Sequence, residues 1–104
     1  MIYWVDLISV KGAPLDGNGP IVTIATPLNN GNIKGAIRAI AIDAAGTLYI
    51  GEFQKNCDTA CTDWIWTVNP DPSGTRDPVL LYSGEFGWIR GLALGDNACH
   101  TPIN

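Results

Sequence analysis

Apolar residues in this chain are gathered in short runs, and clusters of Gly, Pro, Asn and Asp separate the runs. Runs of about four to eight residues between such clusters are typical of β-strands. Long helices are not expected, because 12 Gly and 7 Pro interrupt the chain too often. The runs that fit the strand description are residues 2–6, a weaker 7–11, 21–26, 36–43, 47–52, 64–69, 79–83 and 88–94. The pattern therefore predicts an all-β chain.

The segment 33–45, rich in Ala and Ile, is the one serious rival as a helix. It contains Gly35 and has apolar residues at consecutive positions, whereas an amphipathic helix repeats them every three or four residues. Both faces of residues 36–42 are apolar apart from Arg38. A strand of this kind is covered on both sides, so we predict a strand that lies between two packed layers.

One strand pattern occurs twice. Residues 35–52 hold two apolar runs joined by the turn Asp43-Ala44-Ala45-Gly46; the first run returns as 88–94 and the second has a counterpart in 2–6. Alignment of the two copies places Tyr3 on Tyr49, Val10 on Val68, Pro20 on Pro78 and Ile37-Arg38 on Ile89-Arg90. A period of about 50 residues with four strands per unit favours a β-propeller over a solenoid.

These residues resemble known propeller blades. The run Ile37-Arg38-Ala39-Ile40-Ala41-Ile42-Asp43 with the following Gly46 and Leu48-Tyr49-Ile50 resembles the NHL-type blade, and Ile2-Tyr3-Trp4-Val5-Asp6 resembles the YWTD repeat of lipoprotein-receptor propellers. Similar blades occur in gluconolactonase-like and strictosidine-synthase-like enzymes. The resemblance implies four-stranded antiparallel blades. The chain 1–104 is then one propeller-like unit: 2–26 supply strands two to four of one blade, 36–83 a complete blade, 88–94 the first strand of the next blade, and 95–104 a tail.

The apolar composition of the chain and the open edges of an incomplete propeller both indicate contact with another protein chain. Apolar residues make up 46% of the chain and charged residues 15%, which is rich in core-type side chains for a small body. Two blade-equivalents cannot close a ring and would leave apolar faces in water. We expect either head-to-tail assembly, in which three chains would form a six-bladed ring, or a place within a larger propeller, and we favour the ring.

The net charge of the chain limits the classes of partner that it is expected to bind. The chain has 6 Lys and Arg against 10 Asp and Glu, a net charge of −4, and no basic run, so binding to nucleic acid through phosphates is not expected. Membrane insertion is not expected either, because no apolar stretch approaches the length of a membrane span. The N-terminus lacks the pattern of a signal peptide. The compartment stays open, and an extracellular or periplasmic location is favoured over a cytosolic one.

The three cysteines are Cys57, Cys61 and Cys99. Cys57 and Cys61 lie in one polar loop, where a local disulfide is feasible. The alternative is a zinc site of Cys57 and Cys61 with Cys99 and His100, which is less favoured because adjacent Cys99 and His100 rarely both reach one metal.

Catalytic chemistry is weakly represented. His100 is the only His, and Ser9, Ser73 and Ser83 stand in no Gly-x-Ser-x-Gly context. Acidic side chains offer oxygen ligands for Ca²⁺, namely Asp6, Asp43, Glu52, Asp58, Asp63, Asp71 and Glu85. In gluconolactonase-like enzymes an axial metal is held by such residues, which makes Glu52 and Asp6 the candidates by resemblance. The preferred interpretation is structural: an acid that closes a strand accepts backbone hydrogen bonds, so no cofactor is expected.

Four residues are candidates for ligand binding. Trp64 and Trp88 begin strands beside loops, where exposed rings stack on sugars or anchor a protein interface. Arg38 and Arg90 interrupt apolar strands and would pair with an acidic group or carbonyl, or face an anionic ligand. We therefore predict a non-catalytic propeller-type binding or assembly module for a glycan or protein. The alternative is a subunit of a metal-dependent lactonase- or esterase-like propeller.

Overall fold

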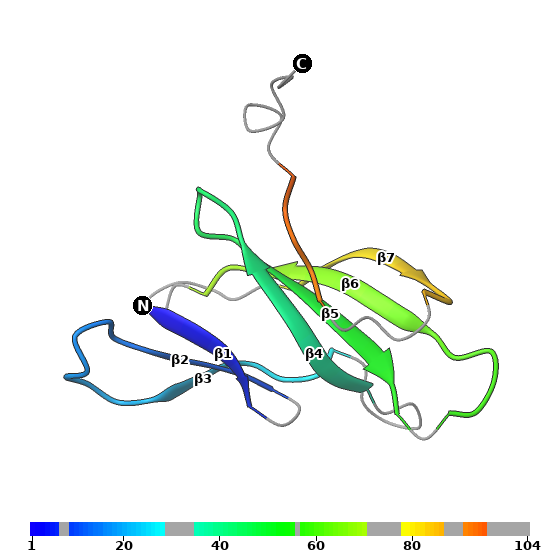
Figure 1. Cartoon of the computed structure of the whole chain (residues 1–104), viewed down its shortest axis with the longest axis horizontal. Helices are drawn as coiled ribbons and strands as arrows, with labels where there is room; N and C mark the ends of the chain where they lie inside the picture. Colours follow the sequence, from blue (N-terminus) through cyan, green and yellow to red (C-terminus); the bar gives the residue numbers. More distant parts are fainter. Residues whose placement is uncertain (7–8, 29–34, 56, 71–77, 87–90, 96–104) are drawn as a thin grey trace, which may run out of the picture.

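In the computed structural model of the chain, the residues described below are 1–6, 9–28, 35–55, 57–70, 78–86 and 91–95. They form two antiparallel sheets and no helix (Figure 1). The first sheet is a meander of β1 (Ile2–Asp6), β2 (Ser9–Ala13) and β3 (Val22–Ala25). The second is a meander of β4 (Gly35–Ile42), β5 (Leu48–Gln54), β6 (Asp63–Val68) and β7 (Val79–Gly84). The all-β prediction is confirmed, and β4 settles the rivalry with a helix in favour of the strand.

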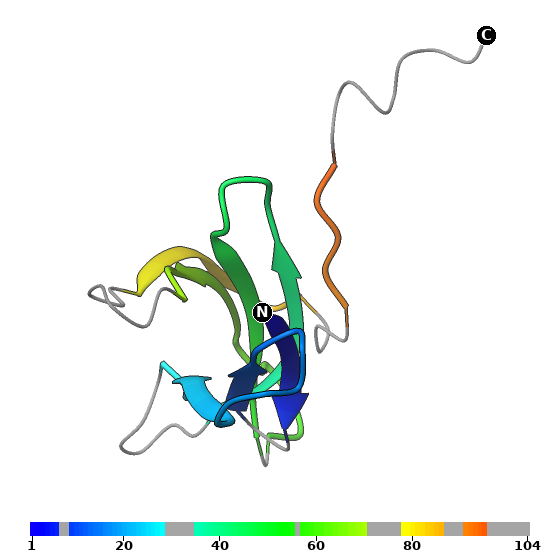
Figure 2. The same ribbon diagram turned by 90° about the vertical axis from the view of Figure 1, so that its left-hand side faces the viewer.

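Within the described residues 91–94, the expected strand over 88–94 is not formed. Residues 88–90 lie outside the described residues, and residues 91–95 (orange in Figures 1 and 2) run beside the sheets without joining either. An extended segment without a hydrogen-bonded neighbour is not a stable strand. The weaker run at 7–11 also needs correction: the strand begins at Ser9, because Val10 and Gly12 are the buried positions that pair with Val5 and Tyr3.

The core lies between the two sheets. Alternate residues of β5 and β6 point toward the first sheet, and we call this the covered face of the second sheet. Its most buried apolar members are Ile37, Leu48, Ile50, Trp64, Trp66 and Val68. From the first sheet, Val10, Ile24 and Ala25 pack against it. The opposite side, which carries Ala39, Ala41, Tyr49 and Ile65, we call the far face; no sheet formed by the described residues covers it.

The β4–β5 turn follows directly from its sequence. Asp43 Oδ1 accepts hydrogen bonds from the backbone N–H groups of Ala45 and Thr47, each at 2.9 Å. The N–H of Gly46 donates to the Asp43 carbonyl at 3.0 Å. Gly46 has a φ of 91°, a left-handed conformation that costs a residue with a side chain about 1–2 kcal/mol. An Asp at the start and a Gly at the end thus set this hairpin.

The two meanders have related strand registers. Tyr3 lies opposite Gly12 in β1–β2, and Tyr49 lies opposite Thr67 in β5–β6. With Tyr3 placed on Tyr49, Val10 therefore corresponds to Ile65. The match of Val10 with Val68 is wrong, because Val10 lies opposite Val5 whereas Val68 lies opposite Leu48.

The bulges correspond as well. The pairing of β2 with β3 shifts between Val10 and Lys11, and the pairing of β6 with β7 shifts between Ile65 and Trp66. These are corresponding positions under the same placement. A bulge re-aims the strand and increases its twist, so both meanders turn at the same point.

Candidate functional site

A buried carboxylate lies where the two sheets meet. Glu52 on β5 is fully buried, and its Oε1 accepts hydrogen bonds from the Leu28 backbone N–H at 2.8 Å and from Trp66 Nε1 at 3.0 Å. Leu28 belongs to the connection after β3, so the carboxylate ties this connection to the second sheet. Hydrogen bonds to a charged acceptor are stronger than neutral ones, and a buried carboxylate requires them.

Gly35 makes room for this carboxylate. A Cβ at Gly35 would lie against Glu52 Oε2 and 2.7 Å from the carboxyl carbon. Gly35 is itself buried at the start of β4, and here the glycine is required by a close approach rather than by backbone conformation.

The arrangement around Glu52 is that of a structural group. Among the described residues, no three His, Cys, Asp or Glu side chains gather at one point. Asp6, Asp58 and Glu85 are exposed, and Asp71 lies outside the described part of the chain. Asp43 serves the β4–β5 turn, as an acid that closes a strand is expected to do.

Asp43 also acts on Tyr49. The Tyr49 hydroxyl donates to Asp43 Oδ2 at 3.3 Å. Desolvation at this half-buried site, and then the neighbouring Asp43 carboxylate, raise the pKa of Tyr49 above its ordinary value of 10.0. Both causes disfavour the tyrosinate, so the pair is most stable with a neutral phenol beside a charged carboxylate.

Of the four predicted ligand-binding residues, the structure describes Trp64 and Arg38, and it gives these two different surroundings. Trp64 is 6% exposed and belongs to the core cluster, a placement that favours packing over stacking on a ligand. Arg38 is exposed at a bulge in the β4–β5 pairing, and its guanidinium carbon lies 5.6 Å from the centre of the Phe53 ring. Trp88 and Arg90 lie outside the described residues, so their ligand-binding roles remain predictions.

Cys57 and Cys61 form a disulfide with their Cα atoms 5.7 Å apart, as expected. Zinc binds thiolates, so this bond removes the first pair from the alternative zinc site; Cys99 and His100 lie outside the described residues. Ala60, within the small ring, has a φ of 55°.

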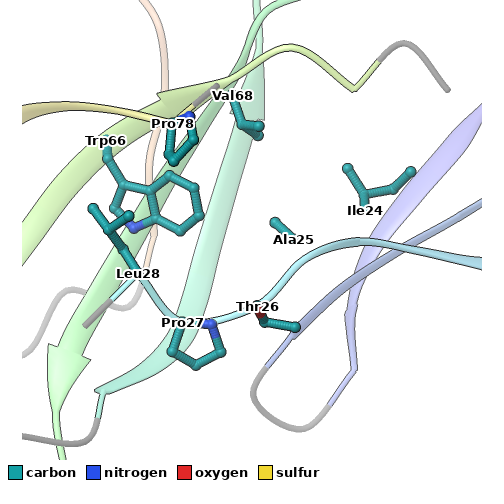
Figure 3. Close-up of a pocket in the computed structure, with 8 residues that line it drawn as sticks. All are labelled: Ile24, Ala25, Thr26, Pro27, Leu28, Trp66, Val68 and Pro78. Carbon is teal, nitrogen blue, oxygen red and sulfur yellow. The ribbon is translucent and has the colours of Figure 1, made fainter. Parts of the chain in front are cut away.

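Among the described residues, two hollows lie between the sheets. The first, about 210 Å³ in volume, lies where the connection after β3 passes β6 (Figure 3). Its lining is Ile24, Ala25, Thr26, Pro27, Leu28, Trp66, Val68 and Pro78. Figure 3 shows the Trp66 ring between Leu28 and Pro78. The side chains that line this crevice are aliphatic or aromatic apart from Thr26, and none of them is suited to proton transfer.

The second hollow, about 320 Å³, lies between β1 and the C-terminal half of β4. It is lined by Met1, Tyr3, Ile40, Ala41, Ile42 and Leu48. Met1 and Ile42 are 43% and 48% exposed. An apolar hollow with exposed apolar rims is typical of a contact surface.

Exposed apolar residues also mark β7. Val79, Leu80, Leu81 and Tyr82 are all at least 43% exposed, and β7 is the edge strand of the second sheet. The sequence predicted strands here but not which edges stay open, because that depends on how the sheets stack.

Within the described residues, no helix is long and apolar enough to cross a membrane. No protein-family model matches the chain, and no curated protein or solved structure is significantly similar to it.

Proposed function

We propose that the chain is a non-catalytic, propeller-type assembly module whose blades are completed by further copies of itself. The observation that supports this best is the correspondence of β1–β2–β3 with β5–β6–β7 in register and bulge position. The second set has a fourth strand, β4, beside β5, while among the described residues no strand lies on that side of β1.

Apolar exposure supports the same proposal. The hollow between β1 and β4 and the outer strand β7 are both apolar and exposed. In a monomer such surfaces promote association. Head-to-tail contacts between identical chains close into a ring when the rotation per chain divides the circle, and three chains would make a six-bladed ring.

Among ligand classes, a protein surface is better supported than a glycan. Sugar recognition by stacking needs exposed rings, and Trp64, one of the two candidate rings, is buried. We therefore take other copies of the chain as the partner.

Native mass spectrometry with and without reductant tests this proposal. We expect a species of several 11.1 kDa chains, with three chains as the expected number, that persists after reduction. A folded monomer at every concentration measured would contradict the assembly role. Hydrolysis of lactones or esters that depends on added Ca²⁺ would favour the enzymatic alternative instead.

A further inference from the structure

The two meanders differ at one edge. β5 is bordered by β6 on one side and by β4 on the other, whereas β1 is bordered by β2 alone within the described part of the chain. A free edge presents unpaired backbone N–H and C=O groups that can accept another strand. The strand that fills the corresponding place, β4, is therefore a template for what would fit beside β1.

A second copy of the β4 pattern exists in the chain. The run Ala36-Ile37-Arg38-Ala39-Ile40-Ala41-Ile42 corresponds to Trp88-Ile89-Arg90-Gly91-Leu92-Ala93-Leu94. Its described part, residues 91–94, forms no strand, and Leu94 is 42% exposed. The sequence of this segment suits an inner strand, and its described part joins neither sheet.

The hollow between β1 and β4 lies beside β1, at the position that corresponds to the place of β4 beside β5. Ile42 is 48% exposed although its partner in the ladder, Leu48, is 1% exposed. A strand added beside β1 would lie over this hollow, with Ala93 on the same side as Tyr3. A small side chain suits a space of about 320 Å³ that must also hold backbone.

We propose that residues 91–94 of a second copy of this chain add to the free edge of β1. The pairing is antiparallel and follows the β4–β5 ladder, in which Ile42 faces Leu48, Ala41 faces Tyr49 and Ile40 faces Ile50. By correspondence, Leu94 faces Ile2, Ala93 faces Tyr3 and Leu92 faces Trp4. This inference rests on the proposed assembly role and names the contact through which it occurs.

The side of each sheet on which the chain continues explains why the segment 91–94 that pairs with β1 comes from a second copy. After β3, the chain continues into β4, whose sheet packs on the Val10 side of the first sheet. Val10 corresponds to Ile65, which lies on the far face of the second sheet. The segment after β7 is therefore directed, by the same pattern, to the far face. The second sheet then separates it from β1 of its own chain.

Cysteine cross-linking tests both the register and the second copy. Ile2 and Leu94 are exposed, so Ile2→Cys and Leu94→Cys leave the core intact. In a Cys99→Ala background, chains that carry one substitution each are co-expressed and oxidised mildly. We expect disulfide-linked dimers in at least about tenfold excess over the control pair Ile2→Cys with Gly95→Cys, which is one residue out of register and directs its sulfur to the other face.

Four outcomes would overturn the inference. Equal cross-linking of the matched and control pairs would refute the register. A cross-linked monomer from the doubly substituted chain would show that the donor segment is in the same chain. Absence of any cross-link, while native mass spectrometry still finds several chains, would refute this contact and leave the assembly role standing. A monomeric unmodified chain would refute both.

Discussion

The two sheets of this protein are built on related strand patterns and differ in what surrounds them. In the second sheet, β5 has a neighbour on each side, and Leu48 and Ile50 are almost completely buried. In the first sheet, β1 is an edge strand, and Ile2, which corresponds to Leu48, is 48% exposed. The same type of strand is therefore a core element in one sheet and an open surface in the other, because burial depends on neighbours rather than on the strand's own sequence.

A side-chain hydrogen bond is likewise buried in the second sheet, and another is exposed in the first. In the second sheet, Glu52 holds the Leu28 backbone and the Trp66 indole inside the core. In the first sheet, a side-chain hydrogen bond between strands joins Lys11 Nζ to Thr23 Oγ1; it is 2.7 Å long and exposed. A buried hydrogen bond to a charged group contributes more than an exposed one, so we expect the second sheet to carry most of the stability.

The largest expected effect tests this comparison at corresponding positions. Leu48→Ala should lower the free energy of unfolding by about 2–5 kcal/mol, because it leaves a cavity in the core. Ile2→Ala should change it by less than about 0.5 kcal/mol in the dilute chain, because Ile2 is exposed. Urea unfolding of the two variants gives both values.

The control for the Leu48→Ala and Ile2→Ala variants is to repeat both measurements at several protein concentrations. If Leu94 of another chain covers Ile2, the cost of Ile2→Ala should grow as the chain associates, while the cost of Leu48→Ala should not. A large cost of Ile2→Ala in the dilute chain would mean that β1 is not an open edge, and the comparison of the sheets would fail.

Two glycines give the next test. Gly35→Ala should cost about 1–3 kcal/mol, because the new Cβ meets a carboxylate that Leu28 and Trp66 hold in place. Gly91→Ala is the matched control: a Cβ there meets nothing within 4 Å, and Ala39 is its counterpart in the β4 pattern. A similar cost for both variants in urea unfolding would refute the role assigned to Gly35.

The features that could be predicted from the sequence are those that depend on residues close together in the chain. Strand positions follow from apolar runs bounded by turn residues, the β4–β5 hairpin follows from Asp43 and Gly46, and the disulfide follows from the spacing of Cys57 and Cys61. Each of these depends on residues within one loop or one strand.

The rest depends on contacts between distant residues. The similarity of the two runs pairs Val10 with Val68 in the sequence, but the register of each hairpin decides which residues correspond. Trp64 looks like a loop-side aromatic in the sequence, and its burial follows from the face of β6 that meets the first sheet. The contact of Glu52 with the Leu28 backbone leaves no sequence signal beyond an acid at the end of a strand and the nearby Gly35.

The connections of the two sheets also differ. Residues 7–8 join β1 to β2, whereas the longer connection between β5 and β6 carries the Cys57–Cys61 disulfide. Closing so small a ring contributes about 2 kcal/mol in the chain-entropy model. Cys57→Ser combined with Cys61→Ser should lower the free energy of unfolding by about this amount. The variant should also be insensitive to reductant, and equal reductant sensitivity of variant and parent would place the effect at Cys99.

The smallest expected effect is an alkaline one, and it belongs to the second sheet, where Tyr49 donates to Asp43. Because the pKa of Tyr49 is raised above 10.0 in the folded chain, the stability that this gives is fully present below the unfolded pKa and is lost as pH rises through the folded pKa. Tyr49→Phe should therefore flatten the fall in stability above pH 10.0.

Asp43→Asn keeps an acceptor for Ala45 and Thr47 but removes the charge, so it should let Tyr49 ionise at lower pH. Tyrosinate absorbance during a pH titration measures this directly. An unchanged titration in Asp43→Asn would leave desolvation as the sole cause, and an unchanged stability profile in Tyr49→Phe would remove Tyr49 from the alkaline transition.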